Sequence, residues 1–180
     1  MHADLVFVLA ARAALAIVFL VAAWQKLRDL ETFEAALANY ALLPNWLLAP
    51  VARVLPLLEL GAGLALVAAP THAAGAMLVL GLLVLVTAAV AINLLRGRAD
   101  VGCGCGGIED EQRLSWALVA RNGVLMLLAL VALIPPTTRE LVWLDYITVA
   151  GAAIAIYGLY VASSQLIANA PRLARLRAHA

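Results

Sequence analysis

Residues 73–95 read AAGAMLVLGLLVLVTAAVAINLL, and this stretch decides the fold class of the chain. Asn93 is its only strongly polar residue. A bilayer has a hydrocarbon core about 30 Å thick, and a helix needs about 20 apolar residues to cross it. The stretch therefore predicts a membrane-spanning helix.

Apolar runs of similar length occur elsewhere in the chain, at about 5–27, 50–69, 114–134 and 141–168. Of the 180 residues, 66% are hydrophobic and only 13% are charged. Soluble domains carry about 25% charged residues, so this composition indicates an integral membrane protein, whose main contact partner is the lipid bilayer. A net charge of +1 gives no sign of nucleic-acid binding.

We therefore predict an all-α fold, a polytopic membrane helical bundle that forms one membrane domain over residues 1–180. Its first four spans form a core, and the fifth span packs alongside. Between the first two spans, Leu30, Phe33, Leu37 and Tyr40 recur at helical spacing. This pattern predicts a short interfacial helix at about 30–43.

The cysteines of the chain are the main candidates for chemistry. There are two, Cys103 and Cys105, and they lie in a loop at about 96–113. Cysteine acts as a nucleophile or metal ligand through its thiolate. A disulfide between them requires a sharp backbone bend, and glycine permits the necessary φ angles. The surrounding glycines are Gly102, Gly104, Gly106 and Gly107.

Three interpretations of this C-x-C turn remain open. A small, strained disulfide ring is easily exchanged, which favours a thiol–disulfide oxidoreductase. Two thiolates also suit a soft ion such as Cu(I), so Cys103 and Cys105 are an alternative metal site. The third interpretation is a structural turn in an assembly factor without chemistry. A single pair cannot relay electrons between thiols, so exchange needs a partner protein or a small-molecule acceptor. The sequence assigns no cofactor and excludes neither a quinone nor a soft metal.

Several polar residues inside or near the ends of the spans approach the membrane face that carries the C-x-C loop. They are Lys26, Glu59, Asn93, Arg121 and Asn122. Ionisable groups in a membrane are costly and usually face partners or a pocket. One interpretation is a polar pocket beneath the cysteines, in which Lys26 or Arg121 favours a thiolate. The other is a structural ion pair of Glu59 with Arg121 or with Lys26. The two are compatible.

The basic residues predict the orientation of the chain. In a five-span topology one membrane side receives Lys26, Arg28, Arg53, Arg96, Arg98, Arg113, Arg172, Arg175 and Arg177. The other side receives only Arg139. Because cytoplasmic loops carry an excess of Lys and Arg, we expect the N-terminus outside, and the C-terminus and the C-x-C loop in the cytoplasm.

The order of several short motifs resembles a known family. They are Lys26-Leu27, Phe33 and Tyr40 before Leu43-Pro44, Pro56 with Glu59, Cys103-Gly104-Cys105, Ser115-Trp116 and Arg121-Asn122. This arrangement is similar to the MauE family of the DoxX-like group of small bacterial membrane proteins. Gly106 stands where the family commonly has an aromatic residue in a C-G-C-F-G turn.

The resemblance implies a multi-pass, redox-associated protein of the bacterial inner (plasma) membrane. Named members are implicated in maturation of the methylamine dehydrogenase small subunit, a disulfide-rich periplasmic protein, beside a thioredoxin-like partner. That role places the cysteines outside the cell, whereas the charge distribution places them inside. We keep the charge distribution as the physical criterion for orientation.

Overall fold

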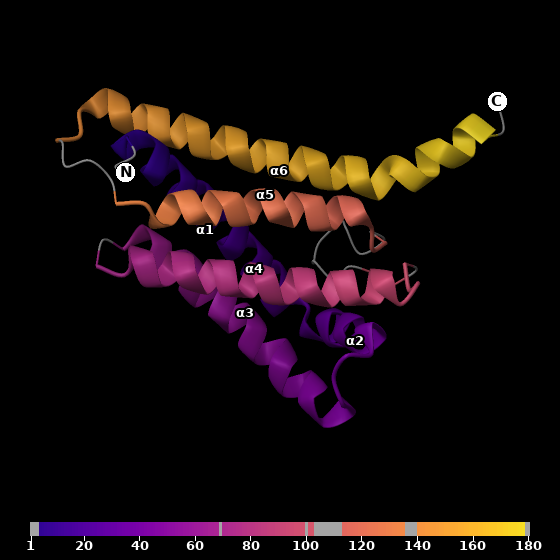
Figure 1. Cartoon of the computed structure of the whole chain (residues 1–180). Helices are drawn as coiled ribbons and strands as arrows, with labels where there is room; N and C mark the ends of the chain where they lie inside the picture. The colour runs from indigo at the N-terminus through magenta and orange to yellow at the C-terminus, as the bar shows by residue number, and fades with distance from the viewer. Residues whose placement is uncertain (1–3, 69, 100, 103–112, 136–139, 179–180) are drawn as a thin grey trace.

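The computed structural model describes residues 4–68, 70–99, 101–102, 113–135 and 140–178, with side chains to residue 169. Six helices make up the described chain (Figure 1). They are α1 (Leu5–Arg28), α2 (Leu30–Tyr40), α3 (Asn45–Val67), α4 (His72–Leu95), α5 (Trp116–Leu133) and α6 (Trp143–Ala178). All except α2 contain a segment long and apolar enough to cross a membrane. The all-α, multi-pass membrane fold is thus confirmed.

Helix α1 is the centre of the bundle. It contacts α3, α5 and α6, and α4 closes the group by packing on α3 and α5. In Figure 1, α6 lies along one side of the molecule and its C-terminal part extends past the other helices. Its segment Trp143–Asn169 is apolar enough to span. The interior carries small and aliphatic side chains, among them Ala14, Leu15 and Val79, which are fully buried.

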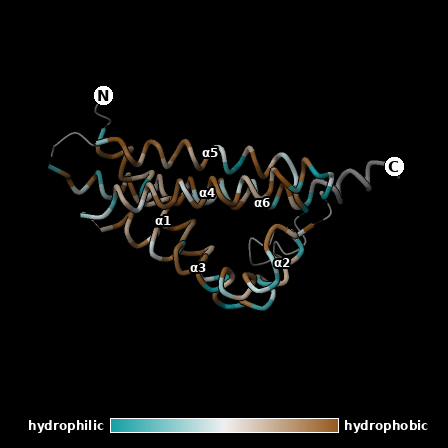
Figure 2. Tube along the Cα trace, turned by 60° about the horizontal axis from the view of Figure 1, so that its bottom comes forward, coloured by the Kyte–Doolittle hydropathy of each residue, from teal (hydrophilic) through white to brown (hydrophobic). Residues whose placement is uncertain are grey.

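The hydropathy of the chain follows this architecture. Figure 2 shows brown, hydrophobic colour along the long helices and teal, hydrophilic colour mainly at their ends and around α2. Many large apolar side chains remain exposed on the outer faces, such as Phe7 at 72% and Val67 at 70%. In water such faces would aggregate, whereas a bilayer solvates them. The outside of the bundle is therefore a lipid-facing surface.

The hairpin of α3 and α4 depends on one glycine. Gly75 lies so close to α3 that a Cβ atom there would be 2.7 Å from the backbone nitrogen of Leu66. Real Cβ atoms do not come so close to backbone atoms, so any larger residue would push the helices apart. Glycine is thus required by close helix packing at this position.

Helix α2 is joined to the bundle at both ends. Asp29 caps its first turn, and its side chain accepts a 3.1 Å hydrogen bond from the backbone of Thr32. This bond lowers the pKa of the Asp29 carboxyl below its usual value. At the other end, Arg98 donates to the backbone carbonyls of Asn39 at 2.9 Å and Tyr40 at 3.3 Å. Carbonyls at a helix C-terminus lack partners in their own helix, and Arg98 supplies donors for two of them.

Some helix ends differ from the sequence prediction. Helix α3 begins at Asn45 rather than near 50, with Pro44 as its N-cap and Pro50 inside the helix. Helix α2 ends at Tyr40, before the expected 43, because Ala41 adopts a left-handed conformation with φ 49°. Helix α6 continues to Ala178, ten residues beyond the expected 168. Composition located each apolar run, but capping and backbone conformation set where each helix stops.

Candidate functional site

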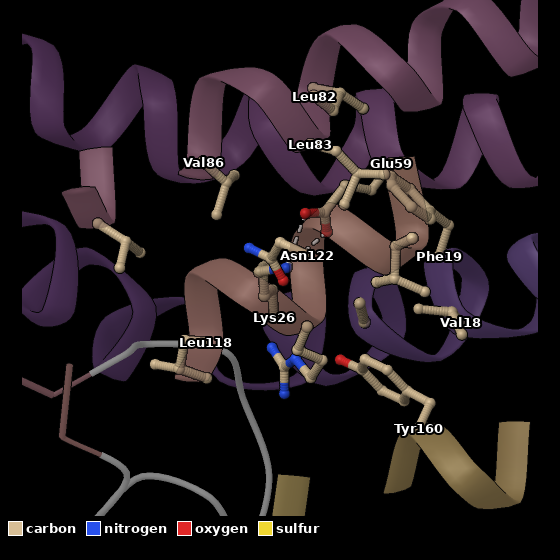
Figure 3. A pocket seen from close by; sticks show the side chains of 14 residues that line it. Val18, Phe19, Lys26, Glu59, Leu82, Leu83, Val86, Leu118, Asn122 and Tyr160 are labelled. Carbon is tan, nitrogen blue, oxygen red and sulfur yellow. Dashed lines mark hydrogen bonds and ion pairs between the residues drawn. The ribbon is translucent and has the colours of Figure 1, made fainter. Parts of the chain in front are cut away.

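The candidate site is a small cavity inside the bundle, of about 80 Å³. Five of the helices line it, and only α2 does not contribute. Its wall is mostly aliphatic, with polar groups from α1, α3, α5 and α6 (Figure 3). Those polar residues are Lys26, Glu59, Arg121, Asn122 and Tyr160. A cavity of this size with several polar groups can hold water, but not a drug-sized ligand.

Lys26 and Glu59 form an ion pair across the cavity. The Lys26 ammonium lies 2.7 Å from both carboxylate oxygens of Glu59. Both side chains are nearly enclosed, with 9% and 7% of their surface exposed. The Lys26 ammonium also lies 5.6 Å from the ring centre of Phe33, which links the pair to α2. Of the two partners that the sequence allowed for Glu59, the structure selects Lys26.

Arg121 lies in the first turns of α5 and turns toward α6 rather than toward Glu59. Its guanidinium donates to the Ser164 hydroxyl and stacks over the Tyr160 ring, 4.8 Å from the ring centre. Its Nε atom is buried without a hydrogen-bond partner. A cation on an aromatic face is attracted by the ring quadrupole, and this contact offsets part of the cost of placing a guanidinium there. Tyr160 and Ser164 are not among the site residues predicted from the sequence.

The two asparagines of the predicted pocket separate. Asn122 lines the cavity, and its Nδ2 donates a 3.1 Å bond to Thr87 of α4. Asn93 lies outside it and donates to the Ala89 carbonyl of its own helix, at 3.1 Å. Four of the five predicted polar residues therefore meet around one cavity. Asn93 does not, because it lies at the end of α4, beyond the last cavity-lining turn at Val90.

The segment with Cys103, Gly104, Cys105, Gly106 and Gly107 lies outside the described residues, but both of its flanks are described. Gly102 and Arg113 form an isolated antiparallel bridge. Beside it, the Leu114 backbone nitrogen donates a 3.1 Å bond to the carbonyl of Val101.

Leu114 anchors this bridge to the bundle. It is 3% exposed and packs in a cluster with Tyr40, Val90 and Leu118. Burial in this cluster raises the pKa of Tyr40 to about 12. The two ends of the cysteine segment are thus fixed side by side at the α4–α5 end of the bundle.

The comparison with known families identifies the group to which these features belong. The model of the family described as "Methylamine utilisation protein MauE" matches residues 5–135. The chain belongs to the MauE family. The matched region runs from α1 through α5 and contains the cavity residues of those helices and the C-x-C segment. Helix α6, which supplies Tyr160, lies beyond it.

Individual MauE relatives support the same assignment. The methylamine utilization protein MauE of Paracoccus versutus is 38% identical over 158 residues, covering 87% of this chain and 85% of the relative. The protein of the same name in Paracoccus denitrificans is 42% identical over 121 residues, covering 67% and 65%. That of Methylorubrum extorquens is 43% identical over 118 residues, covering 66% and 63%. The matches thus span slightly less than two thirds of the latter two relatives. No solved structure matches the chain.

Proposed function

We propose that this membrane protein carries out thiol–disulfide exchange at Cys103 and Cys105, and that the exchange supports maturation of a partner protein. The observation that carries the proposal is the bridge of Gly102 with Arg113. It closes the ten-residue stretch that contains both cysteines of the chain, at a fixed point on the bundle. A closed loop that presents the only thiols of a membrane protein is a suitable platform for exchange.

The chemistry balances between two pairs of thiols. A partner thiolate attacks one sulfur of the Cys103–Cys105 disulfide, the S–S bond breaks, and the released cysteine leaves as a thiolate. A second partner thiolate then attacks the mixed disulfide. The products are a partner disulfide and two thiols in this chain, so two electrons pass from partner to chain. The reverse sequence reduces a partner disulfide.

The names of the relatives suggest the physiological setting. Proteins that are 38–43% identical to this chain are called methylamine utilization proteins. We accordingly propose the small subunit of methylamine dehydrogenase as the maturing protein, reached through a thioredoxin-like partner in the bacterial plasma membrane.

Differential alkylation tests the exchange. The purified chain is oxidised or reduced, and its thiols are then alkylated and counted by mass spectrometry. We expect no alkylation after mild oxidation and two alkylated thiols after reduction. Cys103→Ser and Cys105→Ser serve as matched single-thiol controls, and each should trap a mixed disulfide with a thioredoxin-like protein. Full alkylation under oxidising conditions contradicts the proposal.

Two other experimental results would each favour a different function for the C-x-C segment. Stoichiometric Cu(I) retention that requires both cysteines, without a reversible disulfide, indicates a soft-metal protein. Full support of methylamine dehydrogenase maturation by the Cys103→Ser variant indicates an assembly factor without thiol chemistry.

Orientation needs its own measurement. We propose that the C-x-C segment faces the cytoplasm, on the basis of the basic residues at that end, whereas direct exchange with a periplasmic subunit requires the opposite orientation. In a variant without the native cysteines, Asp100→Cys and Pro136→Cys are labelled separately with an impermeant thiol reagent on intact cells. Position 136 should react and position 100 should not; the opposite pattern reverses the topology.

A further inference from the structure

The charges around the cavity that Lys26 and Tyr160 line do not cancel. Among the described residues of its wall, Lys26 and Arg121 are the basic ones and Glu59 is the acidic one. Lys26 and Glu59 neutralise each other, because the ammonium lies 2.7 Å from both carboxylate oxygens. A guanidinium stays protonated under all ordinary conditions. Arg121 therefore leaves the wall of the cavity with one excess positive charge.

The contacts of Arg121 within the described chain do not supply a negative charge. Its Nη1 donates to the Ser164 hydroxyl, and its central carbon lies 4.8 Å from the ring centre of Tyr160. Its Nε atom is buried without a hydrogen-bond partner. A hydroxyl and an aromatic face offset only part of the cost of a cation in low-dielectric surroundings. Charges held in this way inside a membrane span commonly mark an ion or substrate site.

The cavity is also rich in hydrogen-bond donors. The Lys26 ammonium has three N–H groups, and its described contacts direct two hydrogen bonds at Glu59. The carboxamide of Asn122 has two, and its described contact with Thr87 uses one of them. The guanidinium of Arg121 has five, and one hydrogen bond, to a hydroxyl, is described for it. Figure 3 shows these side chains among those that surround the cavity.

The size of the cavity restricts what it can hold. Its volume is about 80 Å³. An engineered protein cavity of about 150 Å³ admits benzene, so a cavity about half that size suits an ion of one or a few heavy atoms. Its walls are otherwise mostly aliphatic, with Val18, Leu82 and Leu125 among them. A divalent anion would lose more hydration free energy there than one excess cation returns, whereas a weakly hydrated monovalent anion loses less.

The two cations lie near one end of the bundle. Lys26 is two residues before the end of α1, and Arg121 is five residues after the start of α5, about 8 Å along the helix axis. The start of α5 follows the bridge of Gly102 and Arg113. Both charges are therefore within two helical turns of a helix end, a depth that ions reach from the aqueous side rather than through the lipid tails.

We propose that this cavity binds a small monovalent anion of halide size. The Arg121 guanidinium holds it, with further N–H donors from Lys26 and Asn122. The anion neutralises the excess charge and links α5 to α1. Water would hydrate the guanidinium but would leave its charge uncompensated. The site goes beyond the proposed thiol chemistry and involves no cysteine, so anion binding and thiol–disulfide exchange can be confirmed or refuted separately.

The test uses the full-length protein in a neutral detergent, depleted of halide by exchange into gluconate, an anion too large for the cavity. Chloride then replaces gluconate at constant ionic strength. We expect a saturable broadening of the chloride NMR line that bromide displaces. The thermal midpoint should rise with chloride, because an anion that binds only the folded state stabilises it. Sulfate at equal ionic strength should leave the midpoint unchanged. An equal rise in sulfate, or no saturable effect of chloride, would overturn the proposal.

Variants assign the site. Arg121→Gln should weaken chloride binding at least about tenfold, because one hydrogen bond to a charged group is worth about that factor or more. Arg121→Lys keeps the charge and should bind with intermediate affinity; it replaces Arg121→Gln if that variant fails to fold. Arg53→Gln, at an exposed position of α3 outside the cavity, is the matched control and should bind as the unmodified chain does. Chloride affinity that stays unchanged when Arg121 is substituted would refute this site.

Discussion

The ion pair of Lys26 and Glu59 provides the sharpest test of the energetics of this bundle. Both side chains are at least nine-tenths buried, and the ammonium is 2.7 Å from each carboxylate oxygen. With an effective dielectric constant of about 20, unit charges about 4 Å apart attract by about 4 kcal/mol. Removing one partner of a buried pair costs about 3–5 kcal/mol, because the other charge stays buried and uncompensated.

A double-mutant cycle measures this coupling. We expect Glu59→Gln alone and Lys26→Met alone each to lower the free energy of unfolding by about 3–5 kcal/mol, which corresponds to about 6–20 °C in thermal midpoint. The double variant should lose far less than the sum, because neither charge is left without a partner. Thermal unfolding in detergent, followed by circular dichroism, gives all four midpoints.

Arg121 supplies the matched control for this cycle. It lines the same cavity, but it contacts Ser164 and Tyr160 rather than Glu59. Glu59→Gln and Arg121→Gln should therefore lower stability almost additively. Additive losses in the Lys26 cycle, or strong coupling in the Arg121 cycle, would refute the assignment of Lys26 as the partner of Glu59.

Three further predictions concern the rest of the bundle. Gly75→Ala should destabilise the protein by about 1–3 kcal/mol through overpacking against α3. Gly81→Ala, at a helical site with open space, is the control and should be neutral or slightly stabilising. Thermal unfolding of the two variants measures the difference in stability. Arg98→Ala should speed amide hydrogen exchange at the C-terminal end of α2 and in the segment flanking the cysteines, because α2 loses two capping bonds; unchanged exchange would contradict a clamping role. The pKa of Tyr40 is about 12 in the folded protein, above the ordinary value of 10, so the unfolded chain loses this proton first. Its contribution to stability should be complete below pH 10 and be lost as the pH rises toward 12, and Tyr40→Phe should remove that part of the pH dependence.

Composition and periodicity were sufficient for the architecture. The five apolar runs predicted the membrane-crossing helices because a helix in lipid must satisfy its backbone internally, and that requirement is visible in sequence as uninterrupted apolar length. The spacing of Leu30, Phe33, Leu37 and Tyr40 likewise predicted α2. The antiparallel order of the spans was also enough to predict that Lys26, Glu59, Arg121 and Asn122 approach one end of the bundle.

Pairing and burial depended on tertiary structure. Judged by their depth in the membrane alone, Lys26 and Arg121 were equally suitable ion-pair partners for Glu59. The rotation of each helix about its axis determines which basic side chain reaches Glu59. It points Arg121 toward Tyr160 of α6 instead. A second cavity, of about 290 Å³ and lined in part by Arg12, also depends on tertiary structure, because the start of α1, the end of α3 and the start of α6 form it together. Sequence alone thus determined which helices are long and apolar enough to cross a membrane, because that capacity depends on local hydropathy. Only the packed bundle decided which buried charges meet, because that depends on how distant segments turn toward one another.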